Sequence, residues 1–341
     1  MAVHRCAVLD DYQNAAADAA DWSTLSPEVA VDFIDRPIPA DERAEALAPY
    51  SIVVAMRERT PFEAHLLNAI SLTKSEDTPF DADLLSRLPN LKLLVTTGMG
   101  NAAIDLDAAR ERGIVVSGTR GSVGPAAELA WGLLLALMRH IPEEQANFRA
   151  GGDRWQLTLG SDLKGKTLGV VGLGKLGSRV AGYGRAFDMR VLGWSRSNTP
   201  ERSAELGVEY RATLADMLPE CDVVSLHLTL TPETRGIIDA NTLSLMKRDA
   251  VIINTSRGPL IDEAALIAAL TDGRIGGAGL DVFDAEPLDA DHPFRTLPTV
   301  VCTPHLGYVT RETYAIYYSD AVDDIRAFLA GEPKRILKGR E

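Results

Sequence analysis

The segment Thr167–Gly177, with the sequence TLGVVGLGKLG, constrains the fold of this chain more than any other. It begins as a short apolar strand and continues into Gly172, Gly174 and Gly177 at the spacing G-x-G-x-x-G. The first glycine permits a tight turn, the second lets a pyrophosphate approach the backbone, and the third lets a helix pack closely on its strand. A second strand is expected over Met189–Trp194, at β-α-β spacing. The segment therefore predicts a dinucleotide site with phosphates held at a helix N-terminus.

Strands and helices are predicted to alternate on both sides of this segment, which is the pattern of α/β folds with doubly wound parallel sheets. Strands are expected at Ala7–Leu9, Val29–Ile34, Ile52–Val54, Leu93–Thr96, Gly113–Ser117, Val223–Leu226, Ala250–Asn254, Gly277–Asp281 and Val300–Thr303. A mostly apolar helix, Ala126–Met138, is expected to be buried between domains or against another subunit, where Glu128 would need a partner. Trp155 is a candidate interface anchor, and Arg311–Ala330 is predicted to form an amphipathic helix.

The length and charge of the chain exclude several classes of protein. With 341 residues it can form two domains with buried cores. A net charge of -13 argues against binding to nucleic acids or to anionic membranes. No apolar run reaches membrane-spanning length and no signal region is present, so we expect a cytoplasmic protein. Cys6, Cys221 and Cys302 are scattered along the sequence, and we expect them to be buried, reduced thiols.

A near-duplication lies in the first part of the chain. The segment Glu58–Leu67 (ERTPFEAHLL) recurs as Glu76–Leu85 (EDTPFDADLL). A single repeat is too little for a solenoid. The second copy is interpreted as an insertion that lengthens a loop and adds a helical turn or two, or as a remodelled substrate lid.

The residues that follow the second strand of the β-α-β unit bear on the choice of cofactor. An acidic residue at this point selects NAD by binding the adenine ribose, whereas an arginine accommodates the 2′-phosphate of NADP. Here the strand ends in Trp194-Ser195-Arg196-Ser197, without an acid. The guanidinium and the two hydroxyls suit a phosphate, so NADP(H) is favoured. Glu201 lies nearby in the sequence, and NAD(H) stays possible.

Three further motifs each follow a predicted strand, on the edge where open α/β sheets bind ligands. They are Asn254–Pro259 (NTSRGP), Gly279–Pro287 (GLDVFDAEP) and Thr303–Gly307 (TPHLG). Together with the glycine loop, these motifs resemble those of the D-isomer-specific 2-hydroxyacid dehydrogenase family, over nearly the whole chain. The resemblance implies an enzyme similar to glyoxylate or hydroxypyruvate reductases. Such an oxidoreductase transfers hydride between NAD(P)H and a small 2-oxo acid or D-2-hydroxy acid.

The resemblance implies a chemical role for one residue of each motif. Arg257 would bind the substrate carboxylate and polarise its carbonyl, because a guanidinium forms a planar fork that matches a carboxylate. His305 would serve as the acid/base, since histidine exchanges a proton near neutral pH. Glu286 would orient His305 and favour its protonated form. A glutamate at this position argues against formate as the substrate. No two histidines have metal-ligand spacing, so no metal is expected.

The resemblance also implies which residues surround the cofactor and the substrate. Asp281 would hold the nicotinamide carboxamide, backbone N–H groups at Met99 and Gly100 would bind the carboxylate, and Tyr308 would narrow the pocket. The expected cofactor site comprises Gly172, Gly174, Lys175, Leu176, Gly177, Ser195, Arg196, Ser197, Thr229, Thr255, Ser256, Asp281 and Gly307. The expected substrate site comprises Arg57, Met99, Gly100, Arg257, His305 and Tyr308.

The expected architecture consists of two Rossmann-like domains. An NAD(P)-binding domain over residues 121–307 would be inserted into a flavodoxin-like substrate domain formed by residues 1–120 and 308–341. The cleft between them would close on the 2-oxo acid and exclude water. A homodimer is expected from the family. The alternative is a non-catalytic, NAD(H)-sensing protein of the same fold, similar to transcriptional corepressors.

Overall fold

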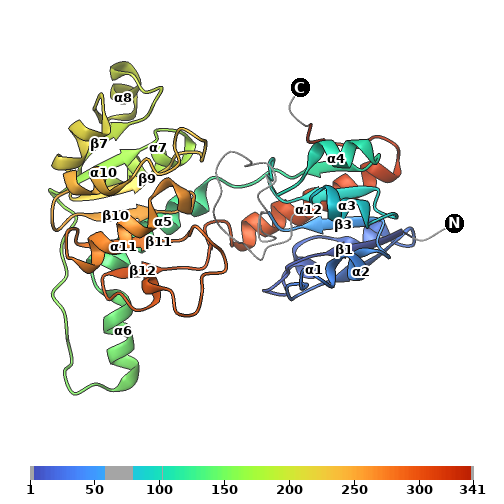
Figure 1. Ribbon diagram of the computed structural model, residues 1–341, viewed down its shortest axis with the longest axis horizontal. Coiled ribbons are helices and arrows are strands. Elements are labelled where there is room, and N and C mark those ends of the chain that lie inside the picture. The colour runs from blue at the N-terminus through green and yellow to red at the C-terminus, as the bar shows by residue number, and fades with distance from the viewer. Residues whose placement is uncertain (1–3, 58–79, 102, 339–341) are drawn as a thin grey trace. The chain divides into compact units, whose positions relative to one another are not determined.

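The computed structural model describes residues 4–57, 80–101 and 103–338. The chain forms two compact units, one made of Met1–Ser122 with Val309–Glu341 (unit 1) and the other of Val123–Tyr308 (unit 2). Each unit contains one parallel sheet, with five strands in unit 1 and seven in unit 2 (Figure 1). The predicted fold class, α/β with two doubly wound parallel sheets, is confirmed.

Unit 1 is built on a sheet with the strand order β2-β1-β3-β4-β5, and every pairing is parallel. Its strands β3 and β4 are buried along their whole length because both faces of the sheet are covered, which explains their unbroken apolar sequences. The strands are β1 (His4–Val8), β2 (Val29–Phe33), β3 (Ile52–Ala55), β4 (Leu93–Thr96) and β5 (Val115–Gly118). The helices are α1 (Ala16–Ala19), η1 (Trp22–Leu25), α2 (Arg43–Leu47), α3 (Ala82–Ser86), α4 (Leu106–Glu111) and α12 (Arg311–Leu329).

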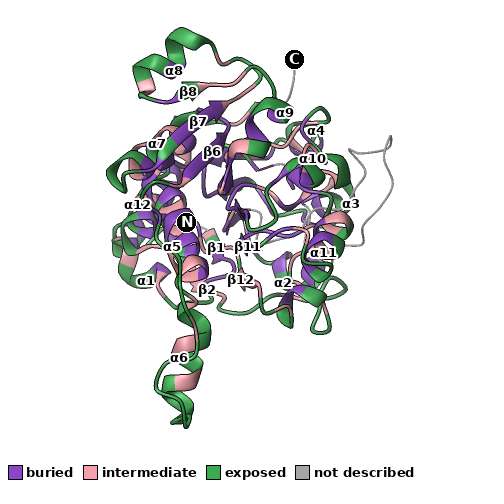
Figure 2. Cartoon of the chain, turned by 90° about the vertical axis from the view of Figure 1, so that its left-hand side faces the viewer, coloured by how far each residue is buried: buried purple, intermediate pink, exposed green. Residues whose placement is uncertain are grey.

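Unit 2 is built on a larger parallel sheet with the order β12-β11-β10-β9-β6-β7-β8. Figure 2 shows buried strands in the interior and exposed helix faces on the outside. The strands are β6 (Thr167–Val171), β7 (Arg190–Trp194), β8 (Glu209–Tyr210), β9 (Val223–Leu226), β10 (Val251–Asn254), β11 (Gly277–Leu280) and β12 (Val300–Cys302). The α-helices are α5 (Gly124–Met138), α6 (Ile141–Ala150), α7 (Lys175–Ala186), α8 (Pro200–Leu206), α9 (Leu214–Met217), α10 (Ala240–Leu245) and α11 (Glu263–Thr271). The 3₁₀ turns are η3 (Leu218–Glu220), η4 (Gly258–Leu260) and η5 (Pro293–Arg295).

Helix α5 packs on β11 and α7 of its own unit. The strand makes room for the helix with glycines, since a Cβ on Gly279 would lie 3.2 Å from Leu133 Cβ and one on Gly277 would lie 3.2 Å from Leu137 Cδ1. Glu128 is exposed, because it lies on the side of the helix away from this contact. Packing within unit 2 therefore gives Glu128 no buried environment, and its burial against another subunit stays a prediction.

The sequence patterns missed α6, α8 and the short strand β8. Helix α6 and the segment that follows it extend away from the sheet of unit 2 (Figures 1 and 2). No residue of α6 is buried, and Phe148, Trp155 and Leu159 are 68%, 80% and 92% exposed. The rings of Phe148 and Trp155 contact each other edge to face, with their centroids 6.0 Å apart.

The thiols differ from the expectation at one position. Cys6 and Cys221 are buried as predicted, and burial raises the pKa of Cys221 to about 12. Cys302, at the end of β12, is exposed, so the prediction of a buried thiol is wrong there. Among the described helices, none combines the length and the apolarity that crossing a bilayer requires.

Candidate active site

The candidate site lies along one edge of the seven-stranded sheet. Since all strand pairs in this sheet are parallel, their carboxyl ends meet at that edge. All the site residues predicted in unit 2 follow the ends of β6, β7, β9, β10, β11 and β12. The sheet therefore collects residues that lie far apart in the sequence.

The glycine loop between β6 and α7 has the backbone that its spacing predicts. Gly172 has a φ of +100°, and a Cβ there would lie 2.6 Å from the His227 carbonyl oxygen. A Cβ on Gly177 would lie 1.8 Å from the Gly172 carbonyl oxygen, so helix and strand pack too closely for any side chain. By contrast, a Cβ on Gly174 would meet nothing within 4 Å. The open space is therefore at the residue that precedes α7, where the helix begins at Lys175 and Leu176.

The segment after β7 brings Arg196 close to an acid from another loop. Arg196 Nη1 lies 3.5 Å from Glu233 Oε2, and both side chains are more than half exposed. Ser195 begins the turn, since its carbonyl oxygen accepts from the Asn198 N–H at 3.1 Å, and Ser197 is exposed. Thr229 precedes Glu233 and is exposed as well. No acid other than Glu233 pairs with Arg196 among the described residues.

The segment after β10 is fixed by its own side chains. Asn254 donates from Nδ2 to the Arg257 carbonyl oxygen at 2.9 Å and accepts from the Ser256 N–H at 3.0 Å. Ser256 Oγ donates to the Leu226 carbonyl oxygen of β9 at 2.8 Å, and Thr255 is buried. The Arg257 backbone is thereby held at the sheet edge, with its side chain half-buried and Nη1 2.7 Å from the Ser256 carbonyl oxygen.

His305 and Glu286 form a hydrogen-bonded pair at the same edge. His305 Nδ1 lies 2.7 Å from Glu286 Oε2, and the two side chains are 24% and 30% exposed. Glu286 Oε1 accepts from the Phe283 N–H at 2.9 Å, which fixes the orientation of the carboxylate. His305 has a φ of +53°, a left-handed conformation that costs energy for a residue other than glycine. Since Nδ1 is engaged by Glu286, Nε2 is the ring nitrogen available to a ligand.

Asp281 makes contacts that the sequence did not suggest. Its side chain is fully buried, and burial raises its pKa. One oxygen accepts from Thr303 Oγ1 at 2.6 Å and from the Leu306 N–H at 2.7 Å, and the other from the Gly307 N–H at 2.8 Å. Asp281 therefore anchors the segment that carries His305. Its contact with a nicotinamide stays a prediction.

The substrate residues predicted in unit 1 follow β3 and β4. The Arg57 N–H donates to Thr97 Oγ1 at 2.8 Å, and the Arg57 carbonyl oxygen accepts from Asn101 Nδ2 at 2.6 Å. The guanidinium donates to Tyr317 Oη at 3.2 Å. Met99 and Gly100 are exposed. The first copy of the near-duplication, 58–67, and the start of the second, 76–79, lie outside the described residues. The described end of the second copy leads into α3, which Asp81 caps.

Tyr308 belongs to unit 2 and packs beside the candidate acid/base. Its ring contacts that of His305 edge to face, with centroids 5.5 Å apart, and the side chain is buried. Over the described parts of the chain, no group of three or more His, Cys, Asp or Glu residues has the arrangement of a metal site.

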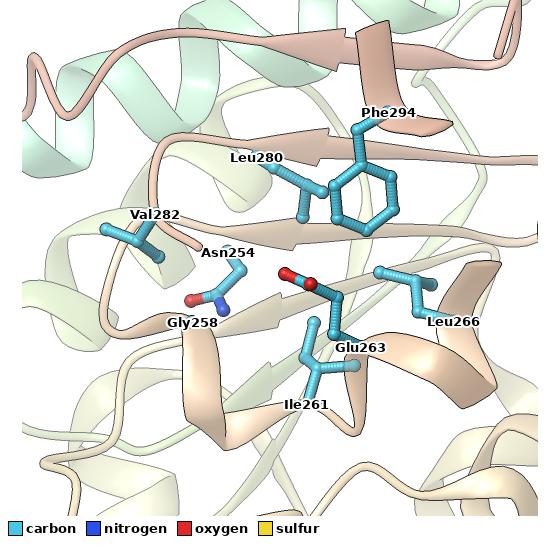
Figure 3. A pocket seen from close by; sticks show the side chains of 8 residues that line it. All are labelled: Asn254, Gly258, Ile261, Glu263, Leu266, Leu280, Val282 and Phe294. Atoms are coloured by element: carbon cyan, nitrogen blue, oxygen red, sulfur yellow. The ribbon is translucent and has the colours of Figure 1, made fainter. Parts of the chain in front are cut away.

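A small cavity is lined by Gly258, the residue after Arg257, and by residues of β10, β11 and α11 (Figure 3). Its polar lining comes from Asn254 and from the Glu263 carboxylate, while the rest is mostly apolar. The lining residues are Asn254, Gly258, Ile261, Glu263, Leu266, Leu280, Val282 and Phe294. The sequence patterns did not single out Glu263, because no motif marks an acid in the first turn of a helix as part of a site.

Comparison with known proteins places these features in a family. The profile of "D-isomer specific 2-hydroxyacid dehydrogenase, NAD binding domain" matches residues 131–307. A glyoxylate reductase of Aeropyrum pernix is 42% identical over 265 residues, which cover 75% of this chain and 78% of that protein. A D-3-phosphoglycerate dehydrogenase of Mycobacterium tuberculosis is 40% identical over 311 residues, which cover 91% of this chain but 55% of that protein.

Solved structures agree with the sequence comparison. A phosphoglycerate oxidoreductase from Vibrio cholerae superposes with a TM-score of 0.85 at 34% identity, over 97% of this chain and 100% of the other. A glyoxylate reductase from Paecilomyes thermophila superposes with a TM-score of 0.73 at 30% identity, over 99% of each chain. This chain therefore belongs to the D-isomer specific 2-hydroxyacid dehydrogenase family, and it is an oxidoreductase of that family with an NAD(P)-binding domain.

Proposed function

We propose that this protein reduces a small 2-oxo acid to the D-2-hydroxy acid with NADPH, and that it catalyses the reverse reaction with NADP. The observation that carries the proposal is the 2.7 Å contact between His305 Nδ1 and Glu286 Oε2, at the edge where the glycine loop also lies. Glyoxylate and hydroxypyruvate are the first candidate substrates, in keeping with the similarity to a glyoxylate reductase.

The glycine loop fits a dinucleotide. The open space at Gly174 would take the pyrophosphate, and the N–H groups of Lys175 and Leu176 at the start of α7 would bind it. Thr229, Thr255, Ser256, Asp281 and Gly307 would line the rest of the cofactor site. When bound, the reduced nicotinamide supplies a hydride to the carbonyl carbon of the substrate.

The protein's own residues orient the substrate and provide the proton. Arg257 binds the carboxylate and polarises the carbonyl oxygen, since its backbone is fixed at the sheet edge by Asn254. His305 donates a proton from Nε2 to the developing alkoxide, while Glu286 holds the imidazole through Nδ1. In the oxidation direction, His305 Nε2 takes the hydroxyl proton. Arg57, Met99, Gly100 and Tyr308 complete the proposed substrate site.

The proposed preference for NADPH depends on Arg196. Its guanidinium is exposed beside Ser195 and Ser197, and its partner Glu233 is also exposed, so a 2′-phosphate can replace that acid. Replacing Arg196 with alanine is expected to weaken NADPH binding about tenfold and to leave NADH binding within twofold, because only NADPH carries the phosphate. Fluorescence titration with each cofactor measures both constants. Wild-type protein that binds NADH more tightly than NADPH contradicts the preference.

We propose a homodimer formed through α6 and the segment that follows it. The rings of Phe148 and Trp155 contact each other and are exposed, and Leu159 is 92% exposed. Exposed apolar side chains that gather in this way mark protein interfaces. Replacing Trp155 with aspartate is expected to convert the dimer into a monomer, as measured by light scattering. Wild-type protein that is monomeric at micromolar concentrations would rule out this interface.

Absorbance at 340 nm tests the enzymatic proposal. NADPH is mixed with the protein and with glyoxylate, hydroxypyruvate, pyruvate or no acid, and NADP with formate serves as a negative control. We expect NADPH consumption with at least one 2-oxo acid and no reduction of NADP by formate. Tight cofactor binding without turnover of any acid would overturn the proposal and favour a cofactor-sensing protein.

A further inference from the structure

The segments that carry Arg257 and Glu286 are in direct backbone contact. Gly258 follows Arg257, and a Cβ placed on it would lie 2.0 Å from the Phe283 carbonyl carbon and 2.6 Å from the Asp284 nitrogen. No side chain fits between two backbones at this separation. The relative position of the two segments therefore depends on whatever holds residues 283 and 284 against Gly258.

Glu263 holds one of these residues directly. It is the first residue of α11, five positions after Gly258, and its Oε2 accepts from the Asp284 N–H at 3.3 Å. Its Oε1 lies 3.1 Å from His292 Nε2, and the two side chains are 23% and 15% exposed. Figure 3 shows the Glu263 carboxylate between Asn254 and Phe294, at the wall of the small cavity.

His292 is itself fixed, so that it can hold Glu263. Its Nδ1 accepts from the Phe294 N–H at 3.3 Å, and its ring contacts that of Phe294 with centroids 4.9 Å apart. Because Nδ1 is an acceptor, the proton of the neutral ring resides on Nε2 and is donated to Glu263. His292 and Glu263 therefore connect both ends of the loop that contains Glu286, since Asp284 precedes Glu286 and His292 follows it.

We infer that Glu263, held by His292, is a positioning residue that fixes the loop bearing Glu286 against the segment bearing Arg257, and so sets the contact between Glu286 and His305. The link is short. Glu263 binds the N–H of Asp284, the neighbouring N–H of Phe283 binds Glu286 Oε1, and Glu286 Oε2 binds His305. This inference rests on the proposed function of Arg257, Glu286 and His305.

The first test compares Glu263→Gln with Asp272→Asn. Both changes neutralise one acid at an end of α11, but Asp272 is exposed at the far end of the helix. For 2-oxo acid reduction, we expect Glu263→Gln to lower kcat by about fivefold to tenfold with an unchanged KM for NADPH, because small displacements of catalytic groups have large effects on rate. Asp272→Asn is expected to remain within twofold of wild type. Equal kcat values for the two variants overturn the inference.

A double-mutant cycle separates positioning from a general structural role. In a Glu286→Gln background, the further change Glu263→Gln is expected to alter kcat by less than twofold, since the group through which it acts is already altered. The same fivefold to tenfold loss in both backgrounds would show that Glu263 acts independently of Glu286. If Glu263→Gln does not fold, His292→Ala replaces it in the cycle, and His292→Gln is expected to restore kcat because a glutamine N–H can also donate to Glu263.

A spectroscopic measurement keeps this inference separate from the proposed reaction. The chain has six histidines, so the His305 ring signals are assignable in an NMR spectrum of histidine-labelled protein. At one fixed pH, we expect Glu263→Gln to move the His305 ring signals in the same direction as Glu286→Gln, and Asp272→Asn to leave them unchanged. His305 ring signals that do not move in Glu263→Gln overturn the inference even if the enzyme is active. Absence of turnover in the wild-type protein overturns the proposed reaction alone.

Discussion

Two glutamate–histidine pairs lie close together in the sequence of unit 2, and they differ in what surrounds them. In the pair His305–Glu286 the nitrogen and oxygen are 2.7 Å apart, and in the pair His292–Glu263 they are 3.1 Å apart. Both nitrogens of His292 are used by the protein, one by Glu263 and one by the Phe294 N–H. Within the described residues, Glu286 takes one nitrogen of His305 and the other has no hydrogen bond.

The backbone of the two histidines differs as well. His292 has an ordinary φ of -62° at the start of η5, whereas His305 has a φ of +53°. A strained backbone persists only where the surroundings hold it, and Asp281 supplies that hold through the N–H groups of Leu306 and Gly307. The same pair of residue types therefore supports structure at His292, where the protein engages both nitrogens, and leaves one nitrogen for the proposed proton transfer at His305.

The largest expected difference between the pairs is the effect of replacing the histidine. His305→Gln is expected to lower kcat for 2-oxo acid reduction by about a thousandfold, because the proposed general acid is lost. His292→Gln is expected to keep kcat within twofold of wild type, since the amide still donates to Glu263. Initial rates at 340 nm under saturating NADPH measure both. If kcat falls by a similar factor in the two variants, the two pairs do not differ in function.

Replacing Glu286 of the His305–Glu286 pair is expected to have the next largest effect. Glu286→Gln keeps the shape of the side chain but removes the charge that orients the imidazole, so kcat is expected to fall about a hundredfold. NADPH affinity is expected to stay within twofold, because the hydrogen bonds of Glu286 within the described residues go to Phe283 and His305 rather than to the glycine loop. A variant with wild-type kcat would show that His305 works without its acid.

A substitution at Asp281 tests whether this residue holds the left-handed backbone of His305 in place. Asp281→Asn leaves one buried N–H facing an amide NH₂ group, and such a mismatch costs about 1–3 kcal/mol of unfolding free energy. We expect this loss in urea denaturation, together with a lower kcat as His305 becomes less well held. Full stability in Asp281→Asn would mean that the segment 303–307 is held by other contacts.

The smallest expected effect is a pH dependence of the unfolding free energy that comes from Asp284, whose N–H donates to Glu263 of the His292–Glu263 pair. Burial and then the nearby Glu263 carboxylate raise the pKa of Asp284 to about 6, with Asp262 adding to this effect and Arg235 opposing it. A raised carboxyl pKa contributes stability below the unfolded value, and this contribution is lost as the pH rises through about 6. The unfolding free energy of Asp284→Asn, measured relative to wild type, should therefore rise by on the order of 1 kcal/mol between pH 4.5 and 7.5. If the two proteins differ in unfolding free energy by the same amount at every pH in that range, the raised pKa of Asp284 is contradicted.

Much of the fold could be predicted from the sequence because its signals are local. Strands β4 and β9 have the expected bounds, since each is a short apolar run in a sheet that is covered on both faces. Helix α6 was missed because its sequence, IPEEQANFRA, has little apolar periodicity and an early proline. The exposed Cys302 was missed because β12 is only partly buried.

The support of the candidate site could not be predicted from the sequence. Glu263 meets the Asp284 N–H and His292, which lie 21 and 29 residues away, and no pattern links positions at such distances. Asp281 belongs to a recognisable motif, but its three bonds to residues 303–307 follow from the pairing of β11 with β12. The left-handed backbone of His305 could not be predicted either, because sequence patterns indicate such a conformation mainly through glycine, and this position is a histidine.

The sheet order of unit 2 has a consequence for how the protein folds. Strand β6, which carries the glycine loop, pairs with β9 as well as with its sequence neighbour β7, and β12 joins the sheet only through β11. Parallel pairings between distant segments require large loops to close first, which makes such topologies slow to fold. We therefore expect recovery of the His305–Glu286 contact to lag behind the recovery of helical circular dichroism during refolding. Regained turnover would then report the completion of the sheet.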